Sequence, residues 1–273
     1  VDETMEDGNK YVTFYYDTET LYEKLDEFGK MPLPPYITKQ LEDQSQYQTV
    51  YAKELGSAAA PTAGLHFTPE LMDTLRAMGV GIAEVTLHVG LGTFRPVQED
   101  EISDHKMHSE WYSISEETAR RIRETKAAGH RVIAVGTTSV RTLESLAALA
   151  WRIRREGSPD EMRAVGQWEL YDVPASYTGR EALEELLAYM ERNDLGMLKA
   201  STQIMIAPLG YRWRIVRAIV TNFHQPKSTL LLLVSAYVGE DWHRIYDYAL
   251  RNDFRFLSYG DSSLLVNDAP FAG

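Results

Sequence analysis

The spacing of apolar residues predicts a helix in the stretch TPELMDTLRAMG. Leu71, Leu75 and Met78 recur at intervals of three and four residues and so share one helical face. Thr68 stands where an N-cap hydroxyl is expected, directly before a proline that suits the first helical position. Gly79 then ends the pattern.

The next stretch, GIAEVTLHVG, alternates apolar and polar residues as a β-strand does. Its apolar side is formed by Val85, Leu87 and Val89. His88 lies on the polar side, near the carboxyl end of the predicted strand.

Strand and helix patterns alternate along the rest of the chain. A helix from about Ser115 to Gly129 precedes the strand RVIAVG, the loop TTS and a helix that starts near Val140. The strand patterns STQIMIA and RIVRAIVTNFH follow, then the apolar segment TLLLLVSAYVG, a helix around residues 242–250, and the terminal FRFLSYGDSSLLV. This alternation predicts an α/β fold, a three-layer α/β/α domain with helices on both faces of a mainly parallel sheet.

The start of the chain is typical of a different module. VDETMEDGNKYVTFYY predicts a hairpin with its turn at residues 6–9, and residues 21–28 predict a helix. A lone hairpin is not stable, so we expect residues 1–30 to be the end of a β-rich module. The proline-rich MPLPPYI then places a boundary, with the α/β domain over residues 31–273.

Residues 151–199 are charged and interrupted by the turns GSPDE and YTGRE. Because such a stretch offers little apolar surface to bury, we expect it to be a peripheral insertion of the α/β domain.

Composition narrows the classes of function. The chain has no cysteine, which excludes disulfides, thiolate metal sites and a cysteine nucleophile. The apolar run Leu230–Val234 is far shorter than the roughly 20 residues of a membrane span, so we expect a soluble protein. A net charge of -12 argues against non-specific coating of nucleic acid. Residues 120–156, however, carry nine Arg or Lys against three Glu, so a local basic face is an alternative to an ordinary solvated helix.

Three of the seven histidines lie close together in the sequence TLHVGLGTFRPVQEDEISDHKMHSEWY. His105 and His108 have a spacing that suits a pair of metal ligands, and His88 could supply a third. The segment around Asp104 reads as a loop, however, and nothing resembles HExxH. We predict a metal-free acid–base and positioning set, in which Asp104 and Glu110 orient the imidazoles; a structural role for at least one histidine stays open.

Polar loops follow several of the predicted strands. In α/β sheets ligands bind beyond the carboxyl ends of strands, which is where His88, Thr137 and His224 fall. VGTTSVRTLES could cradle an anion at a helix N-terminus, or its hydroxyls could simply cap the helix with Arg141 facing solvent. TNFHQPKSTL repeats this pattern, and Asp261 in SYGD could bind a ribose hydroxyl or cap a turn.

Eight motifs, taken in order, closely resemble one family. They are PLPPYI, YQTVYA, APTAGLHFTPEL, TLHVGLGTFRPV, HKMHSEWY, AVGTTSVRTLES, TNFHQPKSTLLLLVSA and FLSYGDSSLL. Over about residues 31–266, apart from 151–199, the chain resembles the S-adenosylmethionine:tRNA ribosyltransferase-isomerases of queuosine biosynthesis. Three features depart from that pattern: the extra Leu209, Gln225 in place of a common leucine, and the length of residues 151–199.

The resemblance implies a bacterial cytoplasmic transferase-isomerase with an α/β domain and an inserted β-barrel domain, of which residues 1–30 are the last part. Its partners would be S-adenosylmethionine and tRNA carrying 7-aminomethyl-7-deazaguanine (preQ1) at the wobble position, with no membrane. The ribosyl part of the donor would move to that amine and rearrange, giving epoxyqueuosine-tRNA with release of adenine and methionine. No metal or further cofactor would be required, because the donor is itself a substrate.

The same resemblance suggests roles for individual residues. His88 would be the leading base, with His66, His105 and His224 as candidates for protonating the leaving group. Donor, phosphate or carboxylate groups would be bound by Gly90, Gly92, Thr93, Thr137, Asp261, Arg95, Arg141 and Lys227. We further expect tRNA to contact a cationic strip drawn from Arg120, Arg121, Arg123, Arg152, Arg154 and Arg155.

Two other classes of function stay open. One is a nucleoside-binding module without catalysis, which would need the anion cradle but not four histidines in separate loops. The other is a hydrolase that releases adenine from small thioethers and works without tRNA.

Overall fold

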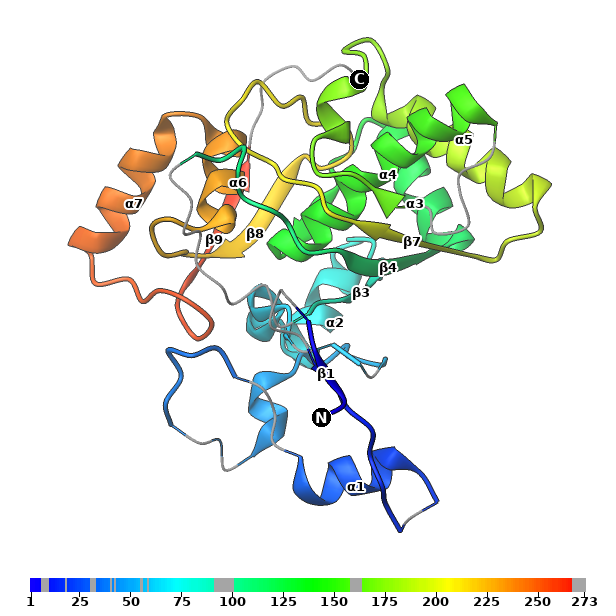
Figure 1. Cartoon of the computed structure of the whole chain (residues 1–273). Helices are drawn as coiled ribbons and strands as arrows, with labels where there is room; N and C mark the ends of the chain where they lie inside the picture. Colours follow the sequence, from blue (N-terminus) through cyan, green and yellow to red (C-terminus); the bar gives the residue numbers. More distant parts are fainter. Residues whose placement is uncertain are drawn as a thin grey trace. The chain divides into compact units, whose positions relative to one another are not determined.

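A computed structural model divides the chain into two compact units, Val1–Ile37 and Thr38–Gly273 (Figure 1). It describes residues 1–5, 10–17, 19–29, 33–39, 41, 43–54, 56–57, 59–90, 101–157 and 164–266. The first unit ends within the proline-rich segment.

The first unit contains the predicted hairpin and helix. Strand β1 (Glu3–Thr4) pairs antiparallel with β2 (Lys10–Tyr11), and the turn predicted at residues 6–9 lies outside the described residues. Helix α1 (Leu21–Phe28) has the predicted bounds and begins at Thr20, which forms a capping box with Glu23. The origin of this unit as a barrel remnant stays a prediction.

The second unit contains a four-stranded sheet in the order β3-β4-β7-β6. Its strands are β3 (Thr86–His88), β4 (Glu110–Ser115), β7 (Met197–Thr202) and β6 (Ala164–Val165). β4 pairs antiparallel with both β3 and β7, whereas β6 and β7 are parallel.

A three-stranded sheet has the order β5-β8-β9. It is formed by β5 (Ile133–Val135), β8 (Ala218–Asn222) and β9 (Ser262–Val266). β5 and β8 are parallel, and β9 is antiparallel to β8.

The α/β class is therefore confirmed, but the prediction of a mainly parallel sheet is wrong. Two physical reasons account for this. β4 was missed because its first inward residue is the buried Glu110 rather than an apolar one. Between β8 and β9 the chain forms two packed helices, α6 (Thr229–Val238) and α7 (Asp241–Arg251), so it returns to the edge where β8 ended and enters β9 in the opposite direction.

Four further helices complete the second unit: α2 (Pro69–Ala77), α3 (Glu116–Ala127), α4 (Thr137–Glu156) and α5 (Gly179–Arg192). Short 3₁₀ helices are η1 (Gln44–Tyr47), η2 (Thr62–His66) and η4 (Glu169–Asp172). The predicted Thr68 cap of α2 is confirmed, because its hydroxyl accepts from the Leu71 N–H. No helix in the part of the chain that the structure describes is long and apolar enough to cross a membrane.

Helix α4 lies at the centre of the core. It contacts strands of both sheets and packs along α5, and its segment Leu146–Ala150 is fully buried (Figure 1). Glu144 of this helix accepts hydrogen bonds from the main-chain N–H groups of Arg214, Ile215 and Val216, at 2.8–3.0 Å. This carboxylate therefore holds the segment that leads into β8 against α4.

The premise that residues 151–199 have little apolar surface to bury is contradicted. Leu183, Leu186 and Met190 of α5 are at most 1% exposed and belong to the main hydrophobic core. The buried Arg214 guanidinium also donates to the main-chain carbonyls of Val173, Pro174 and Tyr177. The segment is therefore part of the core and not peripheral. The sequence did not indicate this because charged residues on one face of α5 masked its apolar face.

Candidate functional site at the carboxyl edges of the two sheets

The carboxyl ends of β5 and β8 lie side by side, because the two strands are parallel and Val135 is opposite Val220. Gly136 follows β5 and donates its N–H to the Val220 carbonyl at 2.8 Å. Its φ of 87° and ψ of 148° form a conformation that is open essentially to glycine alone. Helix α4 starts directly afterwards at the buried Thr137, and within the described ranges no side chain caps its N-terminus. The helix begins at Thr137 rather than near Val140, so the hydroxyl loop of the sequence is its first turn.

β8 ends at Asn222, whose side chain contacts a histidine from a distant motif. The Oδ1 atom of Asn222 lies 3.1 Å from Nε2 of His66, the last residue of η2. The amide nitrogen of Asn222 donates to the carbonyls of Leu257 and Ser258, at 3.0 and 3.1 Å. Asn222 is 2% exposed, whereas His66 is exposed. A buried amide thus holds an accessible imidazole at this edge.

Asp261 lies in the turn before β9 and interacts electrostatically with the same histidine. Its Oδ2 accepts from the Arg255 N–H at 2.7 Å, and this hydrogen bond is the main reason that the pKa of Asp261 lies below its ordinary value. The Arg255 guanidinium and the charge of His66 lower this pKa further. Asp261 is therefore held as a carboxylate whose charge interacts with that of His66. It also stabilises its own turn through the hydrogen bond from the Arg255 N–H.

His224 follows β8 but lies in a different environment. Its Nε2 is 2.8 Å from the Thr221 hydroxyl. Thr221 and Asn222 are consecutive residues of β8, so their side chains point to opposite faces of the sheet. His224 is therefore held on the face opposite to Asn222. Burial lowers the pKa of His224 to about 4. A ring that is neutral at neutral pH is poorly suited to protonate a leaving group.

The four-stranded sheet forms a second polar edge. His88 is the last residue of β3 and is opposite Trp111, while Glu110, the first residue of β4, is opposite Thr202 at the end of β7. The carboxyl ends of β3, β7 and β6 therefore meet at one edge, together with the start of β4.

Arg141 joins this edge to the N-terminus of α4. Its Nη1 donates to Oε2 of Glu110 at 2.5 Å, and both side chains are more than nine-tenths buried. Burial raises the pKa of Glu110, while Arg141 and His108 lower it. Arg141 consequently does not face solvent, and Glu110 pairs with an arginine rather than orienting an imidazole. The Nη2 atom of Arg141 is buried without a hydrogen-bond partner among the described residues, so the binding of an anionic group by Arg141 stays a prediction.

The loop that carries His105 and His108 is held by Gln167. The Gln167 side chain donates to the His105 carbonyl at 2.7 Å and accepts from the Met107 N–H at 2.9 Å. Both ends of one amide therefore fix the main chain on either side of Lys106.

The other predicted site residues are more scattered. Gly90 is exposed directly after β3, and Lys227 is exposed before the start of α6, with a φ of 55°. Gly92, Thr93 and Arg95 lie outside the described residues. Within the described ranges, no group of three or more His, Asp or Glu side chains is arranged to hold a metal ion.

One residue of the site was missed in the sequence, and another was indicated without its partner. Asn222 belongs to the polar loop TNFHQPKSTL that the sequence indicated as a candidate anion site, but its contact with His66 was not predicted. Gln167 could not have been found, because its partners lie 60 and 62 residues away in sequence and their proximity depends on the tertiary fold.

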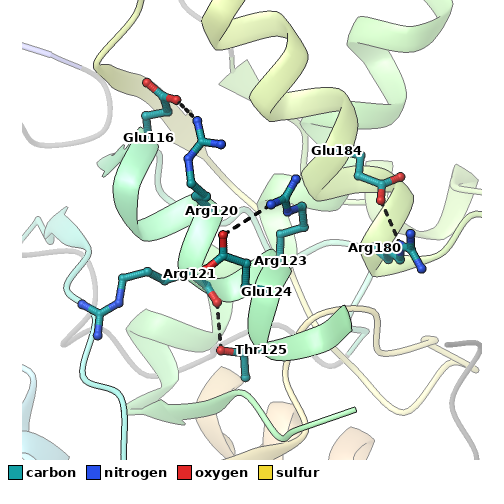
Figure 2. Close-up of polar contacts among 8 residues, drawn as sticks. All are labelled: Glu116, Arg120, Arg121, Arg123, Glu124, Thr125, Arg180 and Glu184. Atoms are coloured by element: carbon teal, nitrogen blue, oxygen red, sulfur yellow. Dashed lines mark hydrogen bonds and ion pairs between the residues drawn. The ribbon is translucent and has the colours of Figure 1, made fainter. Parts of the chain in front are cut away.

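The expected cationic strip is largely paired with carboxylates. Figure 2 shows Arg120 of α3 paired with Glu116, and Arg123 lies 3.4 Å from Glu124. Arg152 forms two hydrogen bonds to Glu169, and Arg154 lies 3.7 Å from Glu181. For the remaining members, Arg121 and Arg155, the described part of the chain shows no carboxylate partner.

Sequence comparison identifies the family. The family model described as "Queuosine biosynthesis protein" matches residues 1–265. The chain belongs to this family. Two curated relatives of the queuosine biosynthesis family are both named S-adenosylmethionine:tRNA ribosyltransferase-isomerase. The one from Desulfitobacterium hafniense is 45% identical over 266 residues, and the one from Staphylococcus haemolyticus is 44% identical over 265. Each alignment covers 97% of this chain but only 65% of the relative's length.

A crystal structure described as S-adenosylmethionine tRNA ribosyltransferase from Thermotoga maritima is 33% identical to this family member. The match covers 75% of this chain and 51% of that chain, with a TM-score of 0.48.

Proposed function

We propose that this chain performs the reaction for which its relatives are named. It transfers the ribosyl part of S-adenosylmethionine to 7-aminomethyl-7-deazaguanine at the tRNA wobble position and isomerises it, releasing adenine and methionine. The proposal includes a cytoplasmic location and no cofactor beyond the donor. It also includes the three-layer arrangement of the α/β unit and the origin of residues 1–30 in a barrel.

One observation carries the proposal: polar groups from separate motifs converge at the carboxyl edges of the two sheets around the N-terminus of α4. His66 meets Asn222 and lies near Asp261, and Arg141 reaches across to Glu110. Ligands of α/β proteins bind at such edges. An uncapped helix N-terminus also favours a negatively charged group, and the donor and the tRNA both carry such groups.

The reaction needs proton transfers, which suit imidazoles near neutral pH. His66 is exposed at the edge of one sheet, and His88 lies partly buried at the edge of the other. These two rings are the candidates for removing a proton from the donor. His224 is a weaker candidate for the acid, because its buried ring is neutral.

The test is a mass measurement on tRNA that carries preQ1 at the wobble position. After incubation with the protein and S-adenosylmethionine, we expect the modified nucleoside to gain the rearranged ribosyl mass, with equal amounts of adenine and methionine released. Adenine release that does not depend on tRNA would replace the proposal with a hydrolase. Binding of the donor with no release of adenine would indicate a binding module.

A further inference from the structure

The orientation of the Asn222 amide is settled by its partners. One end of the amide faces two main-chain carbonyl oxygens, those of Leu257 and Ser258, at 3.0 and 3.1 Å. Carbonyl oxygens only accept hydrogen bonds, so the atom that faces them must be the amide nitrogen. The other end, which faces His66, is therefore the oxygen Oδ1.

This orientation determines where His66 carries its proton. Oδ1 can only accept, and it lies 3.1 Å from Nε2 of His66, so Nε2 must be the donor. In the neutral ring the lone pair is then on Nδ1. His66 is exposed at the edge of the sheet, so a ligand there can approach the residue that carries this lone pair.

We propose that Asn222 is a positioning residue that holds the Nε2–H tautomer of His66, and that Nδ1 of His66 is the atom that accepts the proton from the donor. This inference rests on the proposed function. It transfers to His66 the role of base that sequence reasoning gave to His88, and it gives Asn222 a role that the sequence had not assigned.

The step is balanced without a further reactant. Nδ1 takes a proton from the donor carbon next to the sulfonium sulfur, and the electron pair of the broken C–H bond stays on that carbon. The sulfonium stabilises the carbanion, and His66 becomes an imidazolium. The Nε2–H of this cation still donates to Asn222, and its charge interacts favourably with the Asp261 carboxylate.

Nuclear magnetic resonance of protein labelled with ¹⁵N-histidine tests the tautomer without any substrate. In the unsubstituted protein, the Nε2 of neutral His66 should carry hydrogen and Nδ1 should not. Asn222→Leu should let the ring populate both tautomers. The matched control Asn252→Leu should not, because the Asn252 side chain donates to the carbonyl of Tyr248 in its own helix and not to His66. If Asn222→Leu does not fold, the tautomer of His66 in the unsubstituted protein still tests the inference. Hydrogen on Nδ1 of the neutral ring would overturn it.

Kinetics test the proton transfer itself. His66→Ala should lower kcat by about a hundredfold or more and change KM for S-adenosylmethionine by less than about threefold. Added imidazole should restore part of the rate, because the ring that was removed was exposed at the surface. His88→Ala, measured alongside, should cost less.

A larger loss in His88→Ala, or a His66→Ala rate within about threefold of the unsubstituted enzyme, would overturn the inference. Failure of the inference can be distinguished from failure of the proposed function. If the unsubstituted protein transfers nothing to tRNA, the proposed function fails, and the proton-accepting role fails with it. If transfer is intact and Nδ1 carries the hydrogen, only this inference fails.

Discussion

His224 occupies a site that keeps its imidazole neutral, which makes protein stability depend on pH. Burial lowers its pKa to about 4, below the roughly 6.5 expected in the unfolded chain. As pH falls below about 6.5 the unfolded chain binds a proton that the folded chain does not, so the free energy of unfolding decreases down to about pH 4. The full loss is on the order of 3 kcal/mol.

Urea unfolding of the unsubstituted protein and of His224→Gln from pH 7 to pH 4 measures this effect. The variant should lose less stability over that range, because glutamine does not titrate. Parallel pH profiles for the two proteins would show that His224 is protonated in the folded state. His243→Gln is a suitable control for the loss of a histidine, because His243 lies in α7 and not in the site that holds His224.

The buried pair of Arg141 and Glu110 gives a second prediction at this scale. Arg141→Met removes the guanidinium that lowers the pKa of Glu110, while the burial that raises it remains. Breaking such a pair typically costs about 3–5 kcal/mol, because one charge is left buried without a partner. Since the folded pKa of Glu110 would then lie further above its unfolded value, the cost should grow as pH rises.

Chemical denaturation of Arg141→Met at pH 5 and pH 7.5 checks both the size of the cost and its direction. The double variant with Glu110→Leu should recover most of the lost stability, because it leaves neither charge unpaired. A cost that does not change with pH would mean that Glu110 stays ionised in the folded variant over this range, so that loss of Arg141 does not raise its pKa further. The sequence could not have indicated this pair, because Glu110 and Arg141 are 31 residues apart and each on its own looks like a surface residue.

At the scale of elements, α5 approaches the segment before β8 so closely that only glycine fits at its start. A β-carbon at Gly179 would lie 2.0 Å from the Arg214 carbonyl oxygen. Glycine to alanine in a helix is normally stabilising, but here we expect Gly179→Ala to destabilise the protein by about 1–3 kcal/mol through overpacking.

Thermal unfolding of Gly179→Ala and Gly196→Ala compares a crowded glycine with an open one. Apart from its two chain neighbours, no atom of the described residues lies within 4 Å of a β-carbon built at Gly196, so that control should be neutral or slightly more stable. Equal stability of the two variants would mean that α5 can move away from Arg214. Such freedom would support the peripheral interpretation of residues 151–199 that the buried face of α5 contradicts.

The sequence predicted well those elements that are determined by residues close to one another in the chain. The caps of α2 and α3 and the bounds of α1 follow from hydroxyls and apolar spacing within a few residues. Strand direction is not local, because it depends on whether the intervening helices return the chain to the same edge. The antiparallel β9 and the central position of β4 were therefore beyond the sequence patterns. The site was predicted at the level of loops, whereas its hydrogen-bond partners, such as Asn222 for His66, needed the fold.

At the scale of the whole molecule, a net charge of -12 makes binding of tRNA depend on a few local cations. Four of the six arginines in the expected strip already pair with carboxylates, among them Arg120 and Arg123 on α3 (Figure 2). Helix α5, which contacts both α3 and α4, adds further acidic residues such as Glu184. A continuous cationic strip is therefore a poor description of this surface.

We expect Arg121 and Arg155 to make the phosphate contacts, because the described residues offer them no carboxylate that would first have to be displaced. Each charge reversal, Arg121→Glu or Arg155→Glu, should weaken tRNA binding and reduce the slope of log affinity against log salt by about one. Arg76→Glu makes the same change in net charge at an arginine that is paired with Asp73 at 2.7 Å, so it separates local contacts from the general field. Binding measured at several salt concentrations gives both quantities. If all three variants shift affinity equally and leave the slope unchanged, these arginines act only through net charge and tRNA is held by other parts of the protein.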